Sequence, residues 1–443
     1  MWIAPAPMDK VTEATPSSAW EEDMPSDAVA ASLWRHADFM KLWAAQSISQ
    51  LGARITREGL PFAVVMSLGA TPAQVGLLAA LSRGPAIVVG LTLGGFVDRR
   101  RRRPVMVWSD IGRAAVLASI PLAAWARVLT MTQLYVVAAT VGALSVLFDI
   151  ADRAFLPSLV ADVQLVDANA KLATTDAVAE IGGPALYGVL FQIFTAPLAI
   201  AFNAGSYVLS ALALGAIGHR EPPPTHEHGV AHNVITDFRT GSRTISGDAV
   251  LTPLLILSAT SALFGGFFSA LYMLFALRIA GLNAGMLGST VAVGGAAALV
   301  GASLAPAIIR RFGLGRTIAL TGAAAGLGNL FVPLASGAPW MAMGSLIIAQ
   351  ILGDSFGTVT MIAQASLRQQ LTDRTLMGRV GGVFATLPGV TGVVGALGGG
   401  WLGAVLGARW ALWIACAGLL ATAVYAFFTP LMARSANVEP MED

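Results

Sequence analysis

Apolar and polar positions along this chain form long blocks rather than a regular alternation. Twelve stretches of mainly apolar residues are each long enough for a helix that crosses a bilayer, which needs about 20 residues. They lie near residues 39–67, 73–98, 104–126, 133–156, 169–192, 196–218, 250–277, 286–309, 317–335, 339–364, 378–402 and 408–432. Short Gly- and Pro-rich segments connect most of them, but about 30 polar residues follow the sixth. The pattern predicts an all-α membrane protein with twelve transmembrane helices in two six-helix bundles.

Composition agrees with a membrane protein. Of the 443 residues, 56% are hydrophobic and 12% are charged, whereas soluble domains carry about 25% charged residues. So little polar surface argues against soluble enzymes and nucleic-acid-binding modules. The single cysteine, Cys416, rules out an intramolecular disulfide. We therefore expect the lipid bilayer as a partner and no nucleic acid.

The polar segments divide the chain into five predicted parts. Residues 1–38 form an acidic, Pro/Ser-rich tail without the pattern of a signal peptide, and we expect them to be disordered. The N-terminal bundle should occupy 39–218 and the C-terminal bundle 250–432. Between them, 219–249 is predicted to be a cytoplasmic loop, and 433–443 a cytoplasmic tail.

Basic residues concentrate on one side of the predicted membrane. With the N-terminus inside, the cytoplasmic loops contain Arg99 to Arg103, Arg153, Lys171, Arg220, Arg239, Arg243, Arg310, Arg311, Arg316, Arg368, Arg374 and Arg379. The opposite side has only Arg127, Arg278 and Arg409 near helix ends. Because short cytoplasmic loops carry the excess of Lys and Arg, we expect both termini in the cytoplasm. The protein should be a multi-pass monomer of the inner (plasma) membrane.

The two predicted bundles resemble weak copies of each other at an offset of 211 residues. Arg99 and Arg100 match Arg310 and Arg311, and Asp162 and Leu165 match Asp373 and Leu376. The segment GPALYG (183–188) falls on VGALGG (394–399). Parallel repeats about an axis along the membrane normal describe the two halves of many secondary transporters, whose substrate site lies between them.

The strongest local motif is GGFVDRRRRRP (94–104), between the second and third stretches. It resembles the signature of the major facilitator superfamily, G-x-x-x-D-R-x-G-R-R, matched by Gly94, Asp98, Arg99, Arg102 and Arg103. Arg101 replaces the second glycine of that signature. The resemblance implies a conformational gate in which the acidic residue links the two halves. Without the resemblance, the segment is simply a basic loop that orients the protein.

A second motif, AEIGGPALYG, resembles the export-associated motif of the same superfamily. Gly183, Pro184 and Gly188 match it. The stretches LWAAQSISQLGARIT, DIGRAA, LPSLV, LVDANA and IGGPALYG resemble bacterial exporters of the enterobactin-exporter and macrolide-efflux type. This implies export of a drug, siderophore or secondary metabolite. The alternative interpretation is a packing kink at the proline, with no bearing on direction.

Charged residues inside the predicted spans are the main candidates for a substrate or proton pathway, because each is costly in the membrane unless it is paired or hydrated. The stretch 39–67 carries polar residues spaced by three or four, which places them on one helix face. The candidates for the pathway are Gln50, Arg54, Arg57, Glu58, Glu180 and Asp354. A carboxyl group beside an arginine can exchange a proton as its surroundings change. The alternative is a static ion-pair network, such as Arg54 or Arg57 with Glu58 or Glu180.

The sequence therefore predicts a secondary transporter that exports a small amphipathic organic compound in exchange for protons, and an anionic compound fits best. We expect apolar cavity walls that include Phe264, Phe267, Phe268 and Met273. The absence of a P-loop motif argues against ATP-driven transport, and we expect no metal and no cofactor. An importer or symporter, or a lysophospholipid transporter of the same fold, remains open. A membrane-embedded enzyme or a sensor is disfavoured, because the spans hold no convergent His, Ser or Cys cluster and no loop is long enough for a sensor domain.

Overall fold

The computed structural model describes residues 33–92, 100–194, 196–219, 221 and 234–432, and these residues are almost entirely helical. The N-terminal bundle consists of α1 (Ala37–Ser67), α2 (Pro72–Thr92), α4 (Arg102–Trp125), α5 (Met131–Leu159), α6 (Leu165–Ile193) and α7 (Ala196–Gly215). The C-terminal bundle consists of α9 (Leu251–Leu274), α10 (Ala284–Phe312), α11 (Leu314–Asn329), α13 (Pro339–Leu371), α14 (Met377–Val405) and α15 (Ala408–Phe427). Shorter elements are η1 (Leu33–Arg35), η2 (Asp162–Gln164), α8 (Val234–Ser246), the π-helical turn η3 (Phe275–Ile279) and α12 (Phe331–Leu334).

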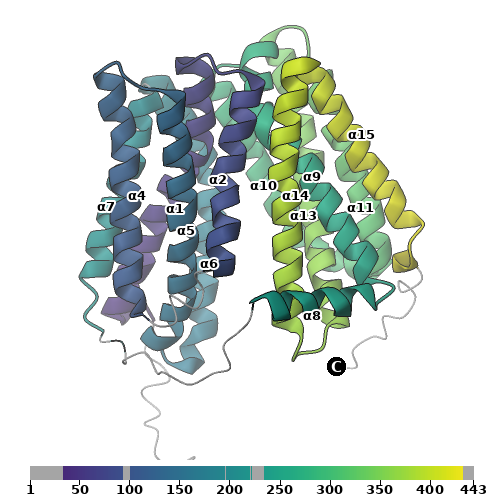
Figure 1. Ribbon diagram of the computed structural model, residues 1–443, viewed down its shortest axis with the longest axis horizontal. Helices are drawn as coiled ribbons and strands as arrows, with labels where there is room; N and C mark the ends of the chain where they lie inside the picture. Colours follow the sequence, from purple (N-terminus) through teal and green to yellow (C-terminus); the bar gives the residue numbers. More distant parts are fainter. Residues whose placement is uncertain (1–32, 93–99, 195, 220, 222–233, 433–443) are drawn as a thin grey trace, which may run out of the picture.

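The predicted fold class is confirmed: two six-helix bundles stand side by side, and α8 lies across the lower end of the second one (Figure 1). We call the end that contains α8 the proximal end and the opposite end, where α1 leads into α2, the distal end. At the distal end one buried apolar core runs through both bundles. At the proximal end each bundle has a separate apolar core of its own. The halves are thus joined distally and packed independently proximally.

The internal repeat is real, but its register is 212 residues rather than 211. Helices α2, α4, α6 and α7 begin 212 positions before α10, α11, α14 and α15, respectively. Helices α5 and α6 also end 212 positions before α13 and α14. The charged loop residues suggested an offset one residue shorter, and one residue rotates a helical position by about 100°. The corrected register pairs Gly183 with Gly395 instead of Val394.

Ten helices of the described part of the chain are long and apolar enough to cross a membrane by length and composition alone. The bundle helices that are not among them are α1, with 31 residues, and α6, with 29. Both carry several charged residues along their length. Polar side chains within a span are tolerated where they face the bundle interior or a water-filled cavity. Helices α1 and α6 should therefore be among those that line the site.

The distal end is closed by direct contact between the halves. Helix α2 lies so close to α14 that a Cβ atom on Gly76 would sit 2.6 Å from the carbonyl oxygen of Ala396 and 2.8 Å from Cα of Gly400. Arg278, in η3, donates hydrogen bonds of 2.7 Å to the carbonyl oxygens of Val65 and Ala70. These carbonyls belong to the last turn of α1 and the turn that follows it. A cation at the carbonyl end of a helix is favourable, so Arg278 ties the second half to the first.

Helix α8 lies within the segment 219–249, where only a loop was expected. Its 13 residues pack against α14 and α9 of the C-terminal bundle. The guanidinium Nε of Arg379 donates a 2.8 Å hydrogen bond to Asp237. A Cβ atom on Gly241 would lie 2.5 Å from the carbonyl oxygen of Arg379, so the helix approaches the backbone of α14 closely. The central connection is thus partly built into the second half.

Candidate substrate and proton pathway

A cavity of about 260 Å³ lies at the seam where α1 and α6 of the first half meet α10 and α13 of the second. Its polar lining consists of Arg54, Arg57, Glu180, Gln350 and Asp354. Its remaining lining residues are small or apolar and come from α10: Val291, Gly294, Gly295 and Ala298. We call this cavity the central pocket. Both halves contribute charged groups to it, and α1 and α6 supply most of them.

An ion-pair network occupies the first half of the central pocket. The guanidinium of Arg54 pairs directly with the carboxylate of Glu180. Nη1 of Arg57 lies 3.6 Å from the other oxygen of the same carboxylate. The side chain of Arg54 is 13% exposed, whereas that of Arg57 is 58% exposed. Arg54 is therefore held in the wall, and Arg57 retains most of its surface for a ligand.

The glycine of the predicted export motif positions this network. A Cβ atom on Gly183 would overlap the Cβ atom of Arg54, so α6 approaches α1 this closely only because residue 183 lacks a side chain. Gly183 lies three positions after Glu180, which is less than one helical turn. Gly183 therefore brings the carboxylate within reach of Arg54. For Pro184 and Gly188 the structure describes only the helical backbone.

Asp354 enters the pocket from the second half. A Cβ atom on Gly294 would overlap the carboxylate of Asp354 and lie 2.6 Å from Nε2 of Gln350, so α10 packs tightly over these two side chains. Asp354 is close enough to Glu180 for the two carboxylates to interact electrostatically. The pocket thus contains two guanidinium groups from one half and one carboxylate from each half. Asp176 of the first half also interacts electrostatically with Arg54 and Glu180, so carboxylates from both halves surround the arginines.

Other predicted residues lie elsewhere or outside the described part. Gln50 lines a second cavity, of about 620 Å³, which lies within the N-terminal bundle. The side chain of Glu58 is not described. Of the predicted gate motif, Gly94, Asp98 and Arg99 fall outside the described residues. These positions remain predictions.

The last two residues of the gate motif make contacts within the first half. The carboxylate of Glu221 accepts hydrogen bonds from the backbone N–H groups of Arg102 (2.6 Å) and Arg103 (2.7 Å) and so caps the start of α4. The side chain of Arg103 donates to the carbonyl oxygens of Leu214 (2.8 Å) and Gly215 at the end of α7. These bonds satisfy backbone groups that a helix end leaves free. Arg103 thus fastens α4 to α7.

The cavity within the N-terminal bundle, which we call the N cavity, contains a charged cluster that the sequence analysis missed. Arg113 of α4 forms an ion pair with Asp110, and both side chains are buried. The Arg113 guanidinium lies 4.5 Å from the ring centre of Phe148 and 4.2 Å from that of Tyr207. Asp149 also lines the cavity. Two charges three residues apart in the apolar stretch 104–126 were the available signal, since such residues within a span mark functional candidates.

The two cavities meet at Arg57, which lines both. The N cavity also contains Arg83 and Arg113, so arginines outnumber its carboxylates. Below it, toward the proximal end, Nε2 of Gln46 donates a hydrogen bond to Asp152. The polar surface therefore extends from the seam into the first bundle and carries charges of both signs.

The expected apolar cavity walls are wrong for two residues. Phe267 and Met273 are 6% and 5% exposed and belong to the buried distal core. Phe267 also lies against Gly399 of α14, where a Cβ atom would be 2.7 Å from its Cα. The aromatic run of α9 packs helices together because α9 crosses the seam at the distal end. No group of three or more His, Cys, Asp or Glu residues in the described part could hold a metal ion.

The family model of the Major Facilitator Superfamily matches residues 42–396, which run from α1 into α14 and leave out α15. The chain belongs to the major facilitator superfamily. An uncharacterized MFS-type transporter of Bacillus subtilis (strain 168), YfiS, is 28% identical over 394 residues, covering 83% of this chain and 88% of that protein. This chain is thus a multi-pass membrane transporter of the superfamily.

Solved structures of superfamily-like transporters share the fold at low sequence identity. A bacterial homologue of the iron transporter ferroportin in an inward-facing state has a TM-score of 0.69 at 18% identity, with 92% of this chain and all of that chain (100%) covered. The nucleoside transporter NupG has a TM-score of 0.69 at 13% identity, covering 90% and 99%. A bacterial homologue of the lysosomal transporter Spinster has a TM-score of 0.67 at 14% identity, covering 92% and 99%. At these identities the likeness shows the fold alone, and the three named proteins differ in function.

Proposed function

We propose that the protein exports a small amphipathic organic anion from the cytoplasm in exchange for protons, by alternating access. The observation that carries this proposal is the central pocket, in which Arg57 is exposed to the cavity beside a carboxylate from each half. A secondary transporter needs its site between the two halves near the midplane. An anion that binds the exposed Arg57 leaves ionised Glu180 paired with Arg54, so the pocket can carry the anion in one step of the cycle and the proton in the other.

The distribution of charge supports the orientation that export requires. Basic residues at the proximal end of the described structure include Arg239, Arg243, Arg310, Arg311, Arg316, Arg374 and Arg379. The positive-inside rule supports a cytoplasmic proximal end. Both termini would then be cytoplasmic, in a protein of the inner (plasma) membrane. The distal end, which Gly76 and Arg278 close, then faces outward. The joined distal core and separate proximal cores favour an inward-facing state, ready to accept a cytoplasmic substrate.

Proton exchange would take place at Glu180. A proton on this carboxylate removes the charge that holds both Arg54 and Arg57. In the exchange cycle this protonated carboxylate returns to the inward-facing state while the pocket holds no anion. Release of the proton to the cytoplasm restores the pair with Arg54, and an anion then binds the exposed Arg57. Both steps use groups already in contact and need no further cofactor.

The test is transport into inside-out vesicles with a panel of amphipathic anions, with and without a pH gradient. Glu180→Gln cannot carry the proton, so it should abolish pH-driven uptake and retain substrate exchange. Asp167→Asn is the matched control, because Asp167 lies on the same helix and pairs with Lys171 near the proximal end, at 3.0 Å. Normal pH-driven uptake by a folded Glu180→Gln protein would contradict the proposal.

The same assay separates the alternatives. An importer or symporter of this fold would accumulate substrate in right-side-out vesicles with the pH gradient reversed. A lysophospholipid transporter would move a lysophospholipid between leaflets and leave soluble anions behind. The likeness of the N-terminal half to enterobactin-exporter and macrolide-efflux proteins favours export, and it makes siderophores and macrolides sensible members of the panel.

A further inference from the structure

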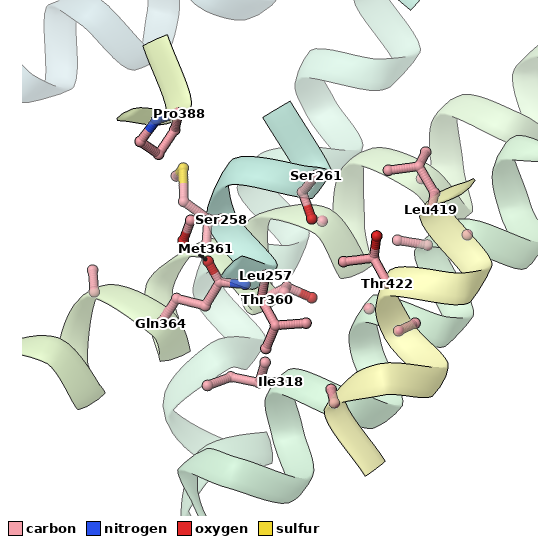
Figure 2. A pocket seen from close by; sticks show the side chains of 18 of the residues that line it. Leu257, Ser258, Ser261, Ile318, Thr360, Met361, Gln364, Pro388, Leu419 and Thr422 are labelled. Carbon is pink, nitrogen blue, oxygen red and sulfur yellow. Dashed lines mark hydrogen bonds between the residues drawn. The ribbon is translucent and has the colours of Figure 1, made fainter. Parts of the chain in front are cut away.

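The C-terminal bundle encloses a cavity of its own, of about 590 Å³, between α9, α11, α13, α14 and α15. We call it the C cavity. Figure 2 shows Ser258 and Gln364 on one side of this cavity and Leu419 and Thr422 on the other. The volume lies within the range of about 300–1,000 Å³ that small-molecule sites occupy. Neither the sequence motifs nor the central pocket accounts for it.

The 212-residue repeat relates the C cavity to the charged interior of the first bundle. Position 46 corresponds to 258, and position 152 corresponds to 364. In the first half Gln46 donates a hydrogen bond to Asp152; in the second, Oγ of Ser258 donates one of 2.9 Å to Oε1 of Gln364. The same hydrogen bond therefore recurs at the same place in each half. What differs is its chemistry, because an uncharged amide replaces the carboxylate.

The other charged or aromatic residues of the N-bundle cluster also have smaller or uncharged counterparts in the second half. Their counterparts at +212 all line the C cavity: Gly322 for Asp110, Ala325 for Arg113, Thr360 for Phe148, Met361 for Asp149 and Leu419 for Tyr207. Where the first half holds the Arg113 guanidinium between two aromatic rings, the second half has alanine between threonine and leucine. Each bundle therefore encloses a cavity at the same place, with a charged lining in the first and a lining of small, apolar and hydroxyl side chains in the second.

The lining of the C cavity has no carboxylate. Its polar groups are hydroxyls and amides, namely Ser258, Ser261, Asn329, Thr360, Gln364 and Thr422. Its charged member, Arg368, has its guanidinium 5.2 Å from the ring centre of Phe384. A cation that entered would lose water without gaining a counter-charge, which is costly. An uncharged group would gain apolar contact and a few hydrogen bonds.

We propose that the C cavity is a binding site for an uncharged, mainly apolar group the size of two aromatic rings, with one or two hydrogen-bonding atoms. In transport this group would be the apolar part of the substrate, and that assignment alone rests on the proposed function. The first half would bind the charged part of the substrate, and the C cavity of the second half would bind its apolar part.

The test uses the photoreactive neutral probe 4-methylbenzophenone on purified full-length protein, with labelled peptides identified by mass spectrometry. The label should fall on C-cavity residues, with Met361 on the wall as a favourable target. Gly357→Leu should reduce this labelling at least tenfold, because Gly357 lines the cavity and faces open space. Gly344→Leu is the matched control: Gly344 lies on the same helix, also in open space, and lines none of the three cavities described above. It should leave labelling within twofold.

A second variant and a second probe complete the design. Gly322→Leu fills the cavity from α11, where its Cβ atom has ordinary contacts of 3.8 and 4.0 Å, and it should act like Gly357→Leu. Gln364→Asp introduces the carboxylate of the first half. A benzophenone that carries a trimethylammonium group should label wild type at least tenfold less than the neutral probe, and Gln364→Asp should narrow that difference.

Each result bears on a distinct statement. Labelling of wild type outside the C cavity, or labelling that survives both filling substitutions, would overturn the site. Equal labelling of wild type by the cationic probe would overturn its preference for uncharged groups. Neutral-probe labelling that the filling variants block, in a protein that transports no member of the anion panel, would leave the site standing and refute the proposed function. Full transport by the filling variants would show that the site is not part of the substrate path.

Discussion

The close approach of α2 to α14 gives a direct test of what holds the distal end shut. Gly76→Ala would place a Cβ atom 2.6 Å from the carbonyl oxygen of Ala396 and 2.8 Å from Cα of Gly400. Ordinary contacts begin near 3.4 Å, so α2 and α14 must separate by roughly 0.6–0.8 Å or the distal end must open. Overpacking of this kind costs about 1–3 kcal/mol. If the contact exists only in the distally closed state, that cost shifts the equilibrium toward the open state by about 5- to 150-fold.

The control for this substitution is Gly84→Ala on the same helix, where a Cβ atom would meet nothing within 4 Å. Both substitutions gain the roughly 1 kcal/mol by which alanine favours a helix over glycine. Any difference between them therefore reports the contact with α14. The gain from helix propensity applies to open and closed states alike, so it does not disturb the comparison.

The assay is the distance between spin labels on the distal ends of the two halves. Trp125→Cys and Leu406→Cys place the labels at exposed positions at the ends of α4 and α14, and the native Cys416 is buried and need not be replaced. Gly76→Ala should add or enlarge a longer-distance population, and Gly84→Ala should reproduce the parent distribution. Identical distributions for the two variants would refute the idea that this contact sets the equilibrium.

Three further predictions follow from charged groups. Arg278→Gln should weaken distal closure by about 1.5–3 kcal/mol and enlarge the same long-distance population, whereas Arg409→Gln, which loses a bond to Ala335 inside one half, should not. Asp110→Asn leaves Arg113 buried without its counter-charge and should lower the free energy of unfolding by about 3–5 kcal/mol, measured by thermal unfolding; no loss would refute the structural role of the pair. Asp98→Asn should lower turnover and leave substrate affinity nearly unchanged in vesicle transport, and a large loss of affinity would count against a gating role.

The fold was accessible from the sequence because long apolar blocks leave few alternatives in a bilayer. Helix α8 was not accessible from the sequence. Its 13 residues mix polar and apolar types within a long polar connection, and that composition resembles a loop. The register of the repeat was also missed by one residue. Loop charges suggested 211, but helix packing depends on side-chain direction, and only the helix positions reveal 212.

The site was predictable one helix at a time. Spacing of three or four placed Arg54 and Arg57 on one face of α1, and Glu180 stood out as a charge within a span. These faces of α1 and α6 meet because Gly183 has no side chain and lets α6 approach α1. Such packing between helices cannot be read from the sequence. Gln50 shares the α1 stripe yet lines the N cavity, because α1 borders both spaces. The Asp110–Arg113 pair lies within DIGRAA (110–115), which entered the sequence prediction as a resemblance and not as a candidate site.

The placement of charge within the two halves bears on how coupling could work. Arg54, Arg57 and Glu180 belong to the same bundle and would move together if the halves rock as rigid bodies. Their mutual distances then change little during the cycle. Asp354 belongs to the other bundle, so its separation from Glu180 is what the motion alters. Two carboxylates repel most when they are closest, and a proton on either relieves that repulsion. The coupling between protonation and conformation should therefore depend on the distance between Glu180 and Asp354 across the seam. The distances between Glu180 and the two arginines of its own half should stay nearly constant.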